Sequence, residues 1–159
     1  MNATRNSPIV SRGEGSLSRA SKYRPRVLVV DDECLIADTL AKVLTLSGYS
    51  AIAAYDADEA LEIALQSPPE LLITDVVLPG MNGIDLSITI KRIFPDCKIL
   101  LFSGQASTVD LLAAAGREGY RFTLLNKPVP PQDLLAMVAE QLNANRMRSG
   151  VGVETIADA

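Results

Sequence analysis

Short apolar runs alternate with amphipathic helical patterns between residues 26 and 142. The runs are rich in β-branched and other apolar residues, which is typical of strands buried on both faces of a parallel sheet. They span 26–30, 50–54, 71–74, 98–102 and 122–125. Each run is followed by a segment with apolar residues at helical spacing. This alternation predicts an α/β fold, a doubly wound sheet of five parallel strands with helices on both faces and right-handed crossovers.

The helical segments are expected to pack on the sheet through apolar stripes. The predicted inward-facing positions, helix by helix, are Leu35, Ile36, Leu40, Val43 and Leu44; Ala60, Leu61, Ala64 and Leu65; Ile84, Ile88 and Ile93; Val109, Leu112 and Ala113; and Leu134, Leu135, Val138 and Leu142. Ser107 or Thr108 is placed to cap the fourth helix, and Pro131 to open the fifth.

The length of 159 residues and the 48% of hydrophobic residues suit one domain with a sizeable core and exclude two large domains. We expect a disordered basic arm over 1–25, the α/β domain over 26–142, and a C-terminal tail over 143–159 without an effector domain. Residues 1–26 carry six basic residues and one acidic residue, whereas the whole chain has a net charge of −4. The basic charges are spread among Ser, Gly and Asn, so nucleic-acid binding is not expected.

The residues that are missing exclude several kinds of chemistry. The chain has no histidine and no tryptophan, so histidine triads and histidine metal sites are excluded. Cys34 and Cys97 are too far apart for a metal motif or a redox pair, and we expect both to be small packing residues, with a redox switch at Cys34 as the alternative. No apolar run approaches the length of a membrane span or a signal peptide. We therefore expect a cytoplasmic protein without a membrane segment.

Polar residues follow four of the five predicted strands. They are Asp31, Asp32 and Glu33 after the first strand, Asp75 after the third, Ser103 after the fourth, and Lys127 after the fifth. Because ligands of open α/β sheets bind beyond the carboxyl ends of the strands, these side chains are expected to gather at one rim.

The composition of this rim favours a metal and a phosphoryl group. Acids gathered at one place raise each other's pKa unless a hard cation lies among them, and Mg²⁺ is the expected ion. Lys127 and Ser103 suit an oxyanion, and an aspartate beside a metal can itself be the nucleophile. The simpler alternatives are helix capping for the Asp-Asp-Glu run and turn chemistry for Asp75 before the loop 78–83.

In combination, these residues resemble the receiver domain of two-component response regulators, of the chemotaxis-regulator type, over residues 26–142. The motifs are VLVVDDE at 27–33, LLITDVVLPGMNGIDL at 71–86, Ser103, and the pair Lys127-Pro128. The resemblance implies a flavodoxin-like (βα)5 sheet with strand order 2-1-3-4-5. It also implies a single-domain regulator in a phosphorelay, whose phosphoryl donor is a sensor histidine kinase or a histidine phosphotransfer protein.

The resemblance assigns roles to the acids. Asp75 is expected to be the phospho-acceptor, Asp32 a direct Mg²⁺ ligand, and Asp31 the acid that holds a metal-bound water. Asp75 and the backbone carbonyl of Val77 are expected to complete the metal ligands.

The resemblance also implies how phosphorylation is sensed. Ser103 is expected to turn toward the phosphoryl group, Lys127 to pair with it, and Pro128 to follow a cis peptide bond. The modified domain would then bind a downstream effector protein through the face of its fourth helix, fifth strand and fifth helix, at 109–116 and 122–137. The resemblance also allows a homodimer that forms on phosphorylation.

Three positions depart from the family pattern. The family usually has Tyr or Phe three positions before the lysine, where this chain has Leu124, and the nearest aromatic residues are Phe122 and Tyr120. Phe122 is a candidate to replace the switch aromatic from a shifted strand. Val77 lies two positions after Asp75, and Gln105 lies two positions after Ser103. In the family, residues at these positions tune dephosphorylation, and the same is expected here. Because Val77 offers no hydrogen bond to an attacking water, we expect slow autodephosphorylation.

Two other functions are kept as alternatives. One is a degenerate receiver that is never phosphorylated and acts as a binding module. The other is a Mg²⁺-dependent aspartyl phosphatase that resembles haloacid-dehalogenase-like enzymes, but the required Asp-x-Asp motif is absent from 31–34. The favoured interpretation is a regulator that is not an enzyme in the usual sense, because it catalyses only its own phosphoryl transfer and slow dephosphorylation.

Overall fold

The computed structural model of the chain describes residues 22–104 and 108–154. Its strands are β1 Arg26–Val30, β2 Ser50–Ala54, β3 Leu71–Asp75, β4 Lys98–Ser103 and β5 Thr123–Asn126. Its helices are α1 Cys34–Leu46, α2 Ala57–Gln66, α3 Gly83–Ile93, α4 Thr108–Arg117 and α5 Pro131–Glu154. Most of the predicted arm lies outside the described residues, and so do Gln105 and Ser107.

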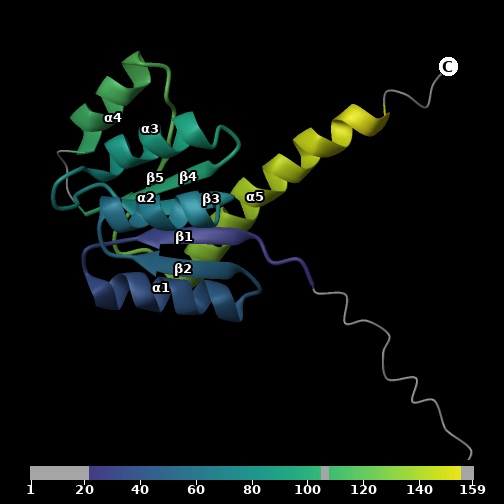
Figure 1. The fold of residues 1–159 in the computed structure, drawn as a ribbon, viewed down its shortest axis with the longest axis horizontal. Helices are drawn as coiled ribbons and strands as arrows, with labels where there is room; N and C mark the ends of the chain where they lie inside the picture. Colours follow the sequence, from purple (N-terminus) through teal and green to yellow (C-terminus); the bar gives the residue numbers. More distant parts are fainter. Residues whose placement is uncertain (1–21, 105–107, 155–159) are drawn as a thin grey trace, which may run out of the picture.

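The five strands form one parallel sheet in the order β2-β1-β3-β4-β5 (Figure 1). The predicted fold class and strand order are confirmed. The predicted strands agree with the observed ones to within one residue at each end, and the largest difference is β5, which is displaced by one residue toward the C-terminus. The register pairs Leu28 with both Ile52 and Leu72, so the β1 strand lies between its two neighbours without a bulge there.

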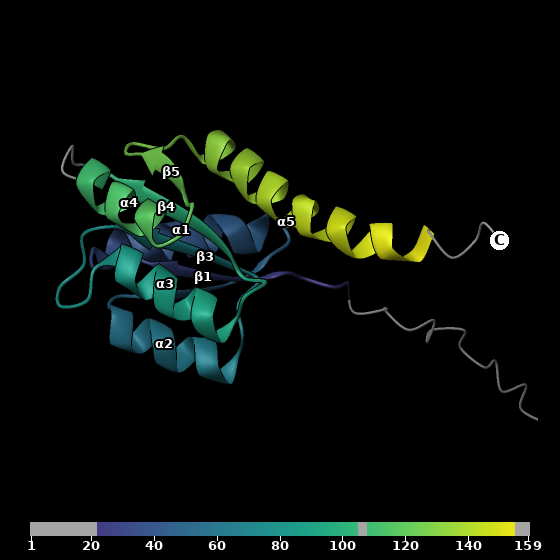
Figure 2. The same ribbon diagram turned by 90° about the horizontal axis from the view of Figure 1, so that it is seen from above.

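Helices cover both faces of the sheet, with α1 and α5 on one side and α2, α3 and α4 on the other (Figure 2). Two hydrophobic clusters result, and adjacent residues of one strand contribute to different clusters. Leu72 packs under α2 to α4, whereas Ile73 packs under α1 and α5. Both are fully buried, which explains why the strands are apolar without alternation.

The predicted apolar stripes are wrong at the ends of several helices. Leu35, Leu65, Ile93 and Val109 are exposed, with Leu35 at 80% and Val109 at 65%. All four lie in the first or last turn of a helix, and these turns lie toward the ends of the sheet strands. In α4 the buried apolar residue is Ala115, and the predicted Ala113 is exposed. Helical periodicity gives the direction of a side chain but not whether the sheet reaches it.

The two cysteines differ. Cys97 is buried as expected, and burial raises the pKa of its thiol to about 12. Cys34 is exposed at the first position of α1, so its prediction as a packing residue was wrong. It lies in a first helical turn, where the sheet does not cover it.

The α5 helix begins at Pro131 as predicted, but it continues to Glu154, beyond the expected end at Leu142 (Figure 1). Residues 143–149 contain neither Gly nor Pro, so nothing in that stretch stops a helix, although it has no apolar stripe to bury. No helix among the described residues is both long and apolar enough to cross a bilayer.

Candidate functional site

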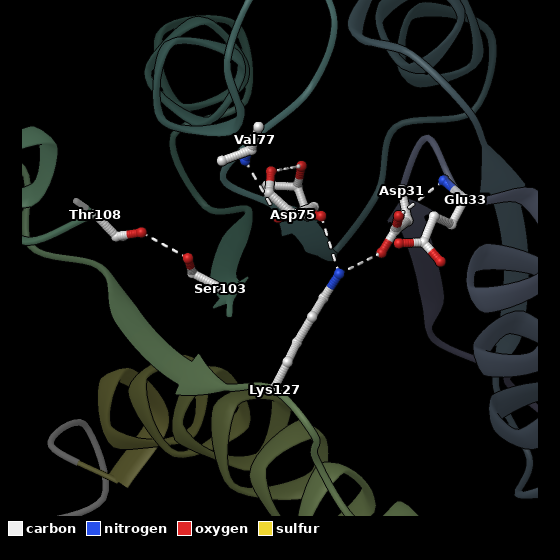
Figure 3. Close-up of polar contacts among 8 residues, drawn as sticks. Asp31, Glu33, Asp75, Val77, Ser103, Thr108 and Lys127 are labelled. Carbon is white, nitrogen blue, oxygen red and sulfur yellow. Dashed lines mark hydrogen bonds and ion pairs between the residues drawn. The ribbon is translucent and has the colours of Figure 1, made fainter. Parts of the chain in front are cut away.

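The carboxyl ends of β1, β3, β4 and β5 bring the predicted polar residues to one rim of the sheet (Figure 3). The β3 strand ends at Asp75, which pairs with Phe102, and the β4 strand ends at Ser103, which pairs with Asn126. Lys127 follows directly and donates its backbone N–H to the Ser103 carbonyl at 3.0 Å. The parallel register therefore aligns residues from four distant segments.

Three acids form a cluster in which one ligand oxygen from each lies within 4.8 Å of the others. Asp31 is buried, Asp75 is partly buried, and Asp32 is exposed. Asp31 Oδ1 accepts a hydrogen bond from the Glu33 N–H at 2.9 Å. Glu33 is the N-cap residue of α1 but makes no side-chain capping bond, so helix capping does not explain this run of acids.

Lys127 joins two of the acids. Its Nζ lies 2.9 Å from Asp31 Oδ2 and 2.9 Å from Asp75 Oδ2 (Figure 3). Burial by itself lowers the pKa of this ammonium group, but the hydrogen bonds to Asp75 and Asp31 outweigh it and the pKa is raised overall. Lys127 therefore stays charged at neutral pH and holds a fixed positive charge beside the carboxylate of Asp75.

The cluster fits a hard divalent cation. Every side chain in it offers a carboxylate oxygen, and the separation of these oxygens, within 4.8 Å, is close to the roughly 4 Å that can separate two oxygens bound to one ion at about 2.1 Å. Asp75 Oδ1 also accepts a hydrogen bond from the Val77 N–H at 3.2 Å, so the chain turns directly after β3 and stays close to the Asp75 carboxylate. The residues present are therefore suited to Mg²⁺.

Gly83, at the start of α3, lies against the backbone of Asp75. A Cβ atom at Gly83 would meet the Asp75 carbonyl oxygen at 1.9 Å. The Gly83 N–H donates to the Val76 carbonyl at 2.8 Å, Ser87 Oγ donates to the Gly83 carbonyl at 2.6 Å, and Asn82 caps α3. By sequence alone the pair Asn82-Gly83 indicates only a loop, because the need for glycine here arises from a tertiary contact.

Ser103 is buried, and its Oγ lies 2.6 Å from Oγ1 of Thr108, the first residue of α4. Figure 3 shows the Ser103 hydroxyl directed toward Thr108, on the side away from Asp75. From the sequence, Thr108 is expected only to cap a helix. Its hydroxyl instead lies against that of Ser103, and no local pattern indicates that pair. The predicted tuning residue Gln105 lies outside the described residues.

Two aromatic residues, Tyr120 and Phe122, lie just before β5. Tyr120 and Phe122 stack with ring centroids 5.9 Å apart, and both pack with Leu124 against the cluster under α2 to α4. Leu124 pairs with Leu101, and Phe122 lies just outside the strand. The peptide bond between Lys127 and Pro128 is cis. A part for Phe122 in sensing phosphorylation remains a prediction.

Fold and rim together define a receiver-type α/β domain: an acidic cluster, a lysine and a buried hydroxyl beyond a 2-1-3-4-5 sheet. The sequence model of the response regulator receiver domain family matches residues 27–139. The chain belongs to this family.

The curated relatives of the chain include two DNA-binding regulators. Over 122 residues the chain is 34% identical to the DNA-binding response regulator MtrA of Mycobacterium tuberculosis, an alignment that covers 77% of this chain and 52% of MtrA. It is 33% identical over 119 residues to the DNA-binding transcriptional regulator NtrC of Azospirillum brasilense, covering 75% of this chain and 24% of NtrC. The chain thus spans about half the length of the first curated relatives it matches, or less.

Solved structures agree with the fold. A CheY-like receiver domain protein of Methanospirillum hungatei superposes with a TM-score of 0.72 at 28% identity, covering 79% of this chain and 99% of that one. The signal receiver domain of an HD domain-containing protein of Pseudomonas fluorescens gives a TM-score of 0.72 at 30% identity, covering 79% and 99%.

Membership of the family carries general properties. Receiver domains accept phosphoryl groups, bind Mg²⁺ through acidic residues, and interact with histidine kinases or phosphotransfer proteins. They are generally not enzymes in the usual sense.

Proposed function

We propose that Asp75 is phosphorylated in a Mg²⁺-dependent reaction and that the modified domain signals through altered binding to another protein. The observation that carries this proposal is the position of Asp75, which shares Lys127 with Asp31 and belongs to the acidic cluster. A carboxylate that only stabilised the fold would not need an ion pair with Lys127 and two further acids beside it.

In the proposed reaction, a carboxylate oxygen of Asp75 attacks the phosphorus of a phosphohistidine. The new O–P bond forms as the N–P bond breaks, and the imidazole leaves with the bonding electron pair. The 159 residues contain no histidine, so the donor lies outside them, on a sensor kinase or a phosphotransfer protein. Lys127 stabilises the negative charge that builds on the transferred group.

Mg²⁺, when bound, would neutralise the carboxylates and attract the phosphoryl oxygens. Asp32, Asp75 and the Val77 carbonyl are proposed as direct ligands, and Asp31 as the acid that holds a metal-bound water. The buried carboxylate of Asp31 keeps its orientation through the Glu33 N–H, which leaves its second oxygen for Lys127.

The decisive experiment measures incorporation of phosphate from a small phospho-donor with Mg²⁺, and binding of beryllofluoride. We expect one phosphoryl group per wild-type chain, none in Asp75→Asn, and wild-type incorporation in Asp58→Asn, an exposed aspartate in α2. Wild-type protein that gains no label and binds no mimic would identify a degenerate receiver. Continuous turnover of a phosphomonoester would instead identify a phosphatase.

The proposed output surface is formed by α4, β5 and α5, at 109–116 and 122–137. Val109 and Leu111 are exposed on α4, which suits a protein partner better than a solvated face. A phosphoryl group adds nearly two negative charges, enough to bias a two-state element by a few kcal/mol.

The partner is proposed to be a separate effector protein in the cytoplasm. MtrA and NtrC are named as DNA-binding proteins, but this alignment covers only part of each. We expect these 159 residues to show no phosphorylation-dependent retention on DNA. Sedimentation with and without beryllofluoride tests the remaining possibility, a homodimer.

A further inference from the structure

The buried hydroxyl pair of Ser103 and Thr108 connects the phosphorylation rim to α4. Their oxygen atoms lie 2.6 Å apart, and both residues are almost completely buried, at 3% and 2% exposure. A hydrogen bond between two neutral hydroxyls at this distance is well formed, and it lies in an environment from which water is excluded.

The backbone of Ser103 is held by β5, so the side chain is the part of this residue that can respond without a change in the sheet. Ser103 ends β4 in register with Asn126, and its carbonyl accepts the Lys127 N–H at 3.0 Å. Rotation about χ1 into another staggered position would therefore redirect the hydroxyl toward the rim without movement of the strand.

We propose that Thr108 is a positioning residue that holds the Ser103 hydroxyl on α4 in the resting domain. This rests on the proposed phosphorylation of Asp75. The phosphoryl group and Thr108 compete for the same hydroxyl, and recruitment of Ser103 to the rim breaks its bond to the first residue of α4. The exchange transmits phosphorylation at the end of β3 to the helix that begins the proposed output surface.

Competition between Thr108 and the phosphoryl group for the Ser103 hydroxyl should lower the affinity of the domain for a phosphoryl mimic. The Thr108–Ser103 hydrogen bond stabilises the resting state, so its removal makes the mimic bind more tightly. One neutral hydrogen bond corresponds to about a twofold to tenfold change in an equilibrium constant.

The test uses beryllofluoride at fixed Mg²⁺ and compares wild type with Thr108→Val and Thr108→Ser. Valine keeps the shape and loses the hydroxyl, whereas serine keeps the hydroxyl. We expect Thr108→Val to bind the mimic about twofold to tenfold more tightly, and Thr108→Ser to restore wild-type affinity. Affinity for Mg²⁺ alone is expected to be equal in all three, because Thr108 is not in the acidic cluster.

A double-mutant cycle separates positioning from a purely structural effect. In a Ser103→Ala background, Thr108→Val is expected to leave mimic affinity unchanged, because no hydroxyl remains to be held. A second readout needs neither metal nor mimic: NMR three-bond couplings report the χ1 rotamer of Ser103. We expect one rotamer in wild type and Thr108→Ser, and a mixture in Thr108→Val. Thermal unfolding establishes that each variant is folded at the assay temperature.

The outcomes distinguish the two proposals. If wild type binds the mimic but Thr108→Val binds it equally or more weakly, or its effect persists with Ser103→Ala, the role of Thr108 is overturned and phosphorylation of Asp75 stands. If wild type binds no mimic, the phosphorylation proposal fails, and this inference fails with it.

Discussion

Lys127 and Asp31 are 96 positions apart in the chain, yet their side chains meet at 2.9 Å at the rim of the sheet. Asp31 is only 1% exposed, so its charge would be costly without a partner. Lys127 provides that partner and reaches Asp75 with the same ammonium group.

Lys127→Met removes the cation and leaves two carboxylates facing each other. We expect a loss of about 1 to 3 kcal/mol in the free energy of unfolding without Mg²⁺, because breaking a buried pair leaves an uncompensated charge. Affinity for Mg²⁺ should rise at least about fivefold, since a unit charge about 4 Å away contributes roughly 1 to 4 kcal/mol. Urea unfolding over a Mg²⁺ titration measures both effects.

The matched control is Lys42→Met, at an exposed position of α1. It should change neither stability nor Mg²⁺ affinity appreciably. The expected rise assumes that Lys127 and Mg²⁺ compete for the carboxylates of Asp31 and Asp75. Equal Mg²⁺ affinity in wild type and Lys127→Met would contradict that competition.

Gly83→Ala places a methyl group against the Asp75 carbonyl, where the Cβ would lie only 1.9 Å from the oxygen. The backbone must shift, so we expect the free energy of unfolding to fall by about 1 to 3 kcal/mol and beryllofluoride to bind more weakly. Gly116→Ala in α4 is the control, because nothing lies within 4 Å of its Cβ. It should stabilise the protein by up to about 1 kcal/mol. Equal stability of both variants would mean that Gly83 is not required.

Val77→Asn should shorten the life of the phosphorylated protein. Val77 is 46% exposed two positions after Asp75, and its side chain offers no hydrogen bond to a water that attacks the phosphoryl group. We expect slow loss of label from wild type and loss several times faster from Val77→Asn. The exposed Val109→Asn, in α4, serves as the control. Loss of label from wild type within seconds would refute the expectation.

The two thiols should react very differently with a neutral alkylating reagent. Burial excludes the reagent from Cys97 and raises the pKa of its thiol to about 12, so almost no thiolate is present at pH 8. Cys34 is exposed and should react completely. Mass spectrometry should find one modification on folded wild type, none on Cys34→Ser, and two after denaturation. Rapid labelling of Cys97 in the folded protein would contradict its burial.

The limits of sequence-based prediction are visible in particular residues. Apolar runs locate the strands because burial on both faces requires them, and residues directly after a strand must lie at its carboxyl end. Leu35 and Cys34 could not be placed in this way, since their exposure depends on how far the sheet extends beneath the first turn of α1. The sequence shows directly that Leu124 stands where the family usually has an aromatic residue, but it does not show that Tyr120 stacks on Phe122.

The sequence by itself determined the parallel sheet and the rim that carries Asp31, Asp75, Ser103 and Lys127, because these follow from local periodicity and from the topology that periodicity implies. The motifs at the strand ends indicated the family. Only the tertiary structure decided what these residues touch. The shared ammonium group, the backbone contact of Gly83 and the bond from Ser103 to Thr108 depend on side-chain rotamers and on helix positions at the sheet edge. Packing of distant segments sets both, and no spacing along the chain records them.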